Sequence, residues 1–132
     1  MRLPDCDEGC NKCINSCPTN ALSGEHTMDM GKCITYLFSK EITDEKLSKQ
    51  MSKWIYGCDV CQDVCPHNQN KYNEAEEFPL LTEHSELLDL KRIMEMDEET
   101  YKNVINPRFW YVGENGLQIW KQNAKRAIEN SK

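Results

Sequence analysis

The pattern of apolar and polar positions predicts a mainly α-helical chain. Between its two groups of cysteines, Asp29 is expected to cap one helix, and the polar run 43–45 is expected to open another. Apolar residues at helical spacing then fall on one face of each helix. The expected inward positions are Ile34, Leu37, Phe38, Leu47, Met51 and Trp54 or Ile55. Ahead of these helices, Ser23-Gly24 is expected to turn the chain.

Three further helices are expected in the C-terminal part. Their starts are Ser85 or Glu86, the run 97–100, and the residue after Asn115-Gly116. The apolar stripe of the third helix consists of Leu117, Trp120, Ala124, Ala127 and Ile128. Its polar face is basic and consists of Lys121, Lys125, Arg126 and Lys132. The simpler interpretation of that face is solvent exposure with a favourable helix dipole, and the alternative is a docking or phosphate contact.

Composition narrows the class of protein. The chain has 132 residues, 39% of them hydrophobic and 29% charged, which predicts a folded domain with a small core. Eight cysteines in so small a core suggest that covalent or inorganic bonds help to hold it together. The net charge of −6 does not favour nucleic acid as a partner of this segment alone.

The sequence contains no targeting or membrane-spanning segment. Residues 1–6 are not the apolar stretch of a signal peptide, and the apolar runs are only a few residues long. A cytoplasmic location without membrane contact is therefore expected, and there thiols stay reduced. This setting favours metal binding over a disulfide framework.

The cysteines form a duplicated pattern. A frame of the form G-C-x2-C-x3-C-P begins at Gly9 and again at Gly57, and one more cysteine precedes each frame. The eight residues are Cys6, Cys10, Cys13, Cys17, Cys33, Cys58, Cys61 and Cys65. C-x2-C lets one tight turn aim two thiolates at the same group. The third cysteine lies one helical turn further on, and the proline after it redirects the chain.

This spacing indicates two [4Fe–4S] clusters. In two-cluster ferredoxins the cysteine before the proline binds the other cluster. Applied here, site 1 consists of Cys6, Cys10, Cys13 and Cys65. Site 2 consists of Cys17, Cys33, Cys58 and Cys61. The alternative is a structural or interaction module with two Zn(Cys)4 sites and no redox function, although zinc has no need of the third cysteine and proline.

The expected fold is a mainly α, ferredoxin-like double [4Fe–4S] cluster domain with a short helical tail. The polar stretch 66–79 predicts the boundary between the two. Residues 1–72 are expected to form the cluster-binding domain, and residues 73–132 a helical tail that packs on this domain. No phosphate loop, HExxH motif or serine nucleophile motif is present, and no catalytic residue is expected. His67 follows Cys65 closely, but a loop histidine in solvent is the simpler interpretation. The tryptophans Trp54, Trp110 and Trp120 are expected in the core.

The cysteine motifs and their surroundings resemble the epoxyqueuosine reductase family. The stretches that carry the resemblance are 13–22, 32–37, 55–66, 98–101 and 123–128, so that it covers nearly the whole chain. Two positions depart from the family pattern. Cys6 and Cys10 stand in a C-x3-C spacing where the family usually has C-x2-C, and His67-Asn68 stands where it often has Trp-Asn.

The resemblance implies a redox function. Members of that family, like reductive dehalogenases, use cobalamin and two clusters, and they reduce epoxyqueuosine in certain transfer RNAs. Their cobalamin-binding domain and catalytic acid precede the first cysteine, whereas five residues precede Cys6. A C-terminal fragment or a standalone relative is therefore expected. It would pass electrons from a flavodoxin or ferredoxin to a cobalamin held elsewhere, and transfer RNA would be a substrate of the full-length enzyme only.

Overall fold

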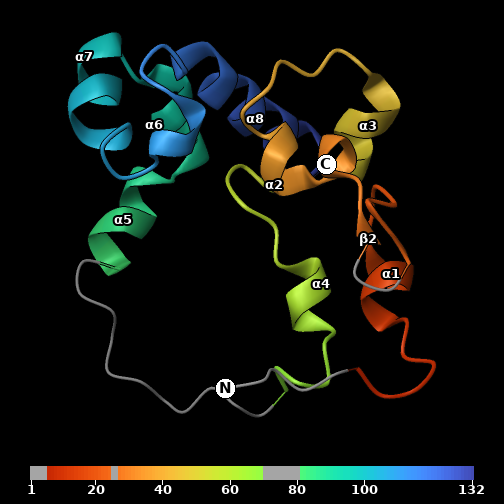
Figure 1. Cartoon of the computed structure of the whole chain (residues 1–132). Helices are drawn as coiled ribbons and strands as arrows, with labels where there is room; N and C mark the ends of the chain where they lie inside the picture. Colours follow the sequence, from red (N-terminus) through yellow and green to blue (C-terminus); the bar gives the residue numbers. More distant parts are fainter. Residues whose placement is uncertain (1–5, 25–26, 70–80) are drawn as a thin grey trace.

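The computed structural model of the chain describes residues 6–24, 27–69 and 81–132. In these ranges the chain is mainly helical, with one two-stranded hairpin (Figure 1). The predicted domain boundary at 72/73 lies outside the described residues. The helices and strands are α1 Lys12–Ser16, β1 Leu22–Gly24, β2 Thr27–Met28, the 3-10 helix η1 Met30–Lys32, α2 Ile34–Leu37, α3 Glu45–Gln50, α4 Val60–Asp63, α5 Leu81–Leu87, α6 Leu90–Glu95, α7 Glu98–Thr100, the π-helix η2 Tyr101–Ile105, the 3-10 helix η3 Trp110–Val112 and α8 Leu117–Glu129.

The hairpin β1–β2 corrects the sequence analysis. The chain does turn near the predicted Ser23-Gly24, but both residues belong to β1, and the reversal lies between Gly24 and Thr27, which pair across the antiparallel hairpin. Leu22 lies opposite Met28 in this pairing. Strands of two or three residues are too short to show the alternation by which a strand is recognised in a sequence.

The helices between the two cysteine frames are close to the prediction. Asp44 caps α3, because its carboxylate accepts a hydrogen bond of 2.7 Å from the Leu47 N–H. The helix predicted after Asp29 is in fact two short helices. Asp29 caps only η1, with a bond of 3.0 Å from the Gly31 N–H, and α2 starts anew after Cys33.

The C-terminal helices differ from the prediction at their start. The prediction that the first of them begins at Ser85 or Glu86 is wrong, since α5 begins at Leu81 and ends at Leu87. A second helix follows because the Asp89 carboxylate accepts hydrogen bonds from the first turn of α6. The predicted start of α8 after Gly116 is confirmed.

One hydrophobic core joins the helices between the cysteine frames to the C-terminal helices. Its buried members are Ile34, Leu37, Phe38, Met51, Leu87, Ile93, Met96, Tyr101, Ile105, Val112, Leu117, Trp120 and Ala124. In Figure 1 these helices form the upper part of the molecule, and α1, α4 and the hairpin extend below it. Trp110 was predicted in the core, but it lies on the short helix η3 with 68% of its surface exposed.

Helix α8 binds the segment that leads into the second cysteine frame. Asn123 is fully buried, and its amide N–H donates to the backbone carbonyls of Phe38 at 2.7 Å and Ile55 at 3.2 Å. Arg126 donates to the Trp54 carbonyl at 2.7 Å and to the Asn123 side chain at 2.8 Å. These bonds fix the chain just before Cys58.

The sequence predicted that Arg126 lies on an exposed basic face of α8, and this prediction is wrong. Only 3% of the residue is exposed, and burial lowers the pKa of its guanidinium. Lys125, next to it, is exposed and forms an ion pair of 4.0 Å with Glu129. The Trp54 carbonyl accepts a hydrogen bond from Arg126, and this long-range partner is not visible in the helical pattern. Within the described ranges, no helix is long and apolar enough to span a bilayer.

Asn123→Ala should destabilise the folded protein by about 2 kcal/mol, because it leaves two buried carbonyls without their donor. The measurement is the midpoint of urea unfolding under anaerobic conditions. Gln122→Ala is the matched control, since Gln122 is only half-buried on the same helix and its two bonds are long, 3.5 Å to the Lys40 carbonyl and 3.4 Å from the Ile42 N–H. An equal fall of the urea midpoint in the two variants would contradict the role assigned to Asn123.

Candidate metal centres

The two cysteine frames adopt the same backbone conformation. The glycine that opens each frame has a left-handed conformation, with a φ of 74° at Gly9 and 73° at Gly57. For L-residues, which have a Cβ atom, this conformation is less stable by about 1–2 kcal/mol. Asn11 and Asp59 then occupy the N-cap positions of α1 and α4. The repeated sequence therefore encodes a repeated turn and helix that present the C-x2-C pairs in the same way.

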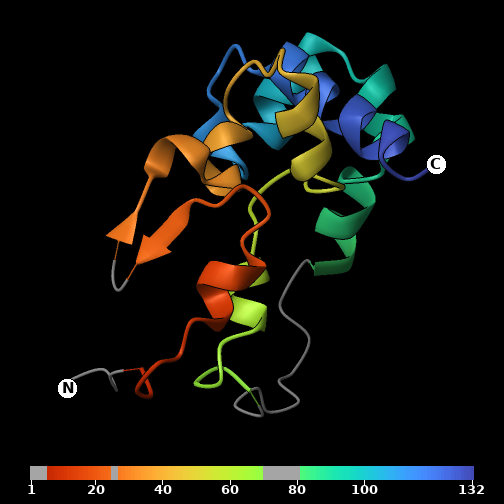
Figure 2. The ribbon, with the colours of Figure 1, turned by 90° about the vertical axis from the view of Figure 1, so that its right-hand side faces the viewer.

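The repeat continues beyond the third cysteine of each frame. The Asn20 N–H donates to the Cys17 carbonyl at 3.2 Å, and the Asn68 N–H donates to the Cys65 carbonyl at 3.0 Å. Helices α1 and α4 lie side by side, which brings the two frames together although they are distant in sequence (Figure 2). This pairing makes the crossed use of the cysteines geometrically possible.

A small pocket is lined by all four cysteines predicted for site 2. Its volume is about 40 Å³, and Cys17, Cys33, Cys58 and Cys61 face it together with Pro18, Thr19, Ala21, Leu22, Met28 and Ile34. Ala21 and Ile34 are each 2% exposed. The thiols thus come from both frames and from Cys33 at the N-cap of α2, and they line a shielded, largely apolar space.

Electrostatics in this pocket oppose an assembly of bare thiolates. Burial raises the pKa of the Cys58 thiol, and like charge on Cys61, Cys33 and Cys17 raises it further, against the lowering effect of the Val60 N–H. A positively charged inorganic core would reverse this repulsion, because thiolates are the ligands of iron–sulfur clusters.

Cys17 differs from Cys58 because it receives several hydrogen bonds. Burial acts to raise the pKa of its thiol, but hydrogen bonds from Ala21 and Thr19 outweigh burial and lower the pKa below the ordinary value. The Ala21 N–H donates to the sulfur at 3.2 Å, and the Thr19 hydroxyl lies 3.7 Å from it. The structure therefore stabilises negative charge on this sulfur.

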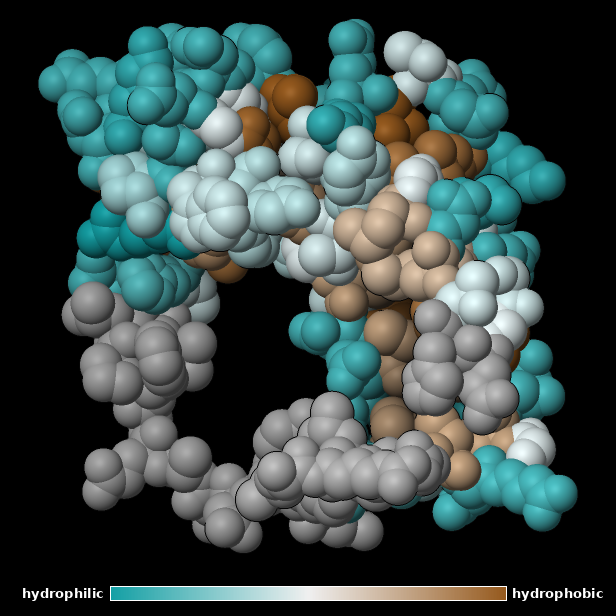
Figure 3. Space-filling view, in the orientation of Figure 1, coloured by the Kyte–Doolittle hydropathy of each residue, from teal (hydrophilic) through white to brown (hydrophobic). Residues whose placement is uncertain are grey.

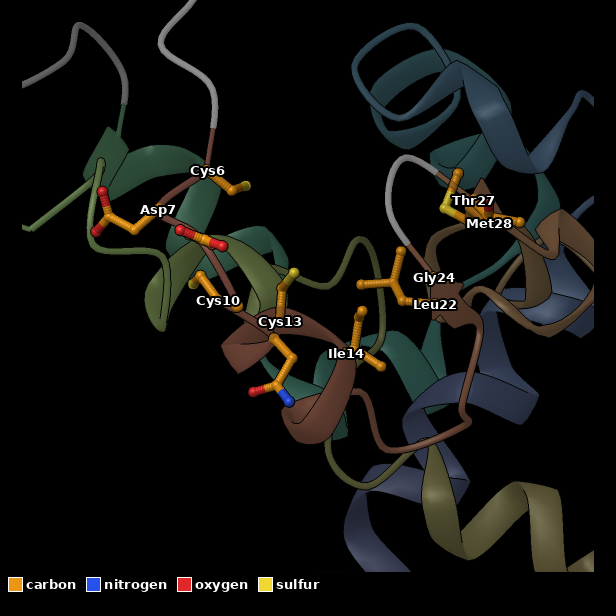
Figure 4. Close-up of a pocket in the computed structure, with 12 residues that line it drawn as sticks. Cys6, Asp7, Cys10, Cys13, Ile14, Leu22, Gly24, Thr27 and Met28 are labelled. Atoms are coloured by element: carbon orange, nitrogen blue, oxygen red, sulfur yellow. The ribbon is translucent and has the colours of Figure 1, made fainter.

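Site 1 is wider and more open. Cys6, Cys10 and Cys13 line a pocket of about 680 Å³, and Cys6 is exposed. Figure 4 shows these cysteines on one side of the pocket, with Leu22, Gly24 and Met28 on the opposite side. Cys65, the fourth ligand predicted for this site, is half-buried and does not line the pocket. The structure thus brings together three of the four residues predicted for site 1.

The donor set fits a thiolate-bound cluster. Cysteines line each pocket. The rest of the smaller lining is apolar apart from Thr19, whereas the larger one also includes the polar residues Asp7, Glu8, Asn11 and Thr27. Backbone N–H donors and burial near the sulfurs are features that tune such clusters. Among the residues that the structure describes, no three His, Cys, Asp or Glu side chains converge on a point where one metal ion could be held.

The surface around the sites is more apolar than the rest of the face shown. Figure 3 shows apolar residues gathered over the part of the molecule that carries the hairpin and α1, whereas the surface over α6 and α7 is hydrophilic. Met28 and Met30, in and beside the hairpin, are 47% and 48% exposed. Thr19, which lines the smaller pocket, has no role predicted from the sequence, where its only signal is its place directly after Cys17-Pro18.

Comparison with known proteins defines the class. Residues 6–68 match the sequence model of the 4Fe-4S double cluster binding domain. The region that holds the eight cysteines is therefore a double [4Fe–4S] cluster binding domain, and the chain is related to the epoxyqueuosine reductases over most of its length.

The relatives support this relationship beyond the cysteines. The epoxyqueuosine reductase of Vibrio cholerae is 35% identical over 134 residues, which cover 92% of this chain and 33% of that protein. The structure of epoxyqueuosine reductase from Streptococcus thermophilus is 28% identical with a TM-score of 0.75, over 94% of this chain and 32% of that one.

A third comparison shows the same fold. A crystal structure of epoxyqueuosine reductase with an epoxyqueuosine-modified tRNA-Tyr stem loop is 24% identical, with a TM-score of 0.74, over 97% of this chain and 34% of that one. The chain spans about a quarter to a third of the length of the curated relatives it matches.

Paired cysteine variants test the crossed ligand assignment. If Cys13 and Cys65 bind the same cluster, the double variant Cys13→Ala/Cys65→Ala should keep the other cluster and retain about four iron atoms per chain. Cys61→Ala/Cys65→Ala removes one ligand from each site and should retain almost none. Iron and acid-labile sulfide are measured on anaerobic protein. If Cys61→Ala/Cys65→Ala instead retains about four iron atoms and Cys13→Ala/Cys65→Ala almost none, each frame binds its own cluster.

Proposed function

We propose that this chain is an electron-transfer module that holds two [4Fe–4S] clusters and relays single electrons between redox partners. The observation that carries this proposal is the pocket that Cys17, Cys33, Cys58 and Cys61 line together, in a domain of the double-cluster class. The proposed arrangement is ferredoxin-like. Its two halves are the repeated frames on α1 and α4, which lie side by side.

The proposed ligands follow the crossed assignment. Cys6, Cys10, Cys13 and Cys65 would hold one cluster, and Cys17, Cys33, Cys58 and Cys61 would hold the other. Three residues of the first set already share one pocket, and all four of the second set do. In the first set, Cys65 would need to approach the other three when a cluster binds.

The bound clusters would supply one-electron chemistry that needs no proton at a protein group. The chain's own residues would set the conditions for it. Ala21, Leu22 and Ile34 limit the access of water to the smaller pocket, and the Ala21 N–H stabilises charge on Cys17. The open lining around Cys6 would leave the other cluster near solvent, where a donor could approach.

The finer part of the proposal concerns the partners. The relatives are named epoxyqueuosine reductases, and one structure of this fold contains a modified transfer RNA stem loop. We infer that the electrons pass from a flavodoxin or ferredoxin to a cobalamin held by another domain or protein. Transfer RNA would be the substrate of that complete enzyme, and a cytoplasmic location is in keeping with reduced cysteine thiols.

Metal analysis tests the core of the proposal. Anaerobically prepared protein should contain about eight iron and eight sulfide per chain, with a visible absorption band that bleaches on addition of dithionite. Air exposure can destroy clusters, so the same preparation under air is the control. Tightly bound zinc without iron or sulfide in the anaerobic sample would refute the electron-transfer function and favour a structural metal module.

A mixing experiment tests the acceptor. Reduced protein, freed of dithionite, is mixed with the cobalamin-loaded catalytic part of an epoxyqueuosine reductase that lacks its own cluster domain. The cluster absorption should return much faster than with free cobalamin at the same concentration, because docking shortens the path between the redox groups. Equal rates with free and protein-bound cobalamin would contradict the proposed acceptor.

A further inference from the structure

Thr19 is a buried polar residue in the smaller pocket. Only 7% of it is exposed, and it lies two residues after Cys17. The other buried polar side chains among the described residues, Asn123 and Arg126, donate to backbone carbonyls. Thr19 instead places its hydroxyl oxygen 3.7 Å from the Cys17 sulfur. Its contact with a predicted ligand atom distinguishes it from these two buried residues.

We propose that the Thr19 hydroxyl raises the reduction potential of the cluster bound by Cys17, Cys33, Cys58 and Cys61. This inference rests on the proposed function, because it requires a cluster in that pocket. Thr19 would be a tuning residue and not a ligand. It would act through the hydrogen bond to Cys17.

The direction of the effect follows from charge. One-electron reduction of the bound cluster adds one negative charge that is shared by the thiolate sulfurs. Dithionite supplies this electron in the redox titration described below. A thiolate bound to iron has no proton to donate, so the hydroxyl of Thr19 must be the donor. A hydrogen bond to a charged acceptor grows stronger as the negative charge on that acceptor increases. The bond therefore stabilises the reduced state more than the oxidised state.

The surroundings of Thr19 enhance this effect. Ala21 and Ile34, which line the same pocket, are each 2% exposed. Such apolar burial disfavours additional negative charge and would by itself lower the reduction potential. Hydrogen bonds are also stronger in a medium of low dielectric constant. The Thr19 hydroxyl, with the Ala21 N–H at 3.2 Å, would therefore offset part of the cost of burial.

The two frames differ at this position. His67 occupies in the second frame the place that Thr19 has in the first, although the turns over 17–20 and 65–68 share their backbone hydrogen bond. Over the described ranges, the structure shows a side-chain hydrogen bond to the sulfur at Thr19 but none from His67 to Cys65. The hydroxyl should therefore tune one of the two clusters and distinguish it from the other.

The test compares Thr19→Val with Thr19→Ser. Valine keeps the shape of threonine and removes the donor, whereas serine keeps the donor. Both reduction potentials are measured by EPR-monitored redox titration of the anaerobic protein at matched iron content. Thr19→Val should lower one of the two potentials and leave the other unchanged, and Thr19→Ser should keep both near those of the wild type.

Ser16→Ala is the matched control. The Ser16 hydroxyl is three residues away and donates to the Cys13 carbonyl at 3.3 Å, so its removal should leave both potentials unchanged. Unchanged potentials in Thr19→Val, or an equal shift in Thr19→Ser, would overturn the inference. If Thr19→Val does not load clusters, Thr19→Ala replaces it, and resonance Raman spectra give a second readout. Loss of the hydrogen bond should raise one iron–thiolate stretching frequency, and an unchanged frequency would overturn the inference as well.

The outcomes separate this inference from the proposed function. A wild-type protein without reducible clusters would contradict the proposed function and, with it, the role of Thr19. A wild-type protein with two reducible clusters, whose potentials are insensitive to the Thr19 hydroxyl, would contradict only this inference.

Discussion

The gathering of cysteines from separate segments around one pocket is the constraint on which the rest of this structure depends. Four of them line a pocket of about 40 Å³, although they come from three separate segments of the chain. Burial and like charge both oppose ionisation of Cys58 in that position. A bound cationic cluster would relieve this conflict, and its binding would then be coupled to folding. The proposed clusters would join the two frames and stabilise a region that has little hydrophobic core of its own.

The helical part supports this region from one side. The buried core is built by residues between the frames and by the C-terminal helices, and Cys58 packs against it. Helix α8 adds hydrogen bonds between the two parts, from Asn123 to the Ile55 carbonyl and from Arg126 to the Trp54 carbonyl. The second frame begins two residues later, at Gly57. A rigid helix thus holds one end of a loop that must place Cys58 and Cys61 accurately.

The sequence predicted those features that depend on local chemistry. The frames were recognisable because glycine, cysteine and proline each have a distinct backbone or ligand role. The helix starts expected in the polar runs 43–45 and 97–100 were recognisable because aspartates there, Asp44 and Asp97, accept hydrogen bonds from the first turn. Features that depend on long-range contacts were missed. Arg126 is buried where the distant Trp54 carbonyl accepts its hydrogen bond, and the exposure of Trp110 likewise depends on which surfaces pack together. The assignment of individual cysteines to clusters stays a prediction.

The central claim is that the crossed use of two frames places two clusters close to each other. EPR spectroscopy of the fully reduced, anaerobically prepared protein tests it most directly, because paramagnetic clusters at short range broaden and split each other's signals. The fully reduced protein should show two spins per chain with such an interaction, which disappears when only one cluster is reduced. Two sharp, independent signals, or no iron–sulfur signal, would contradict it.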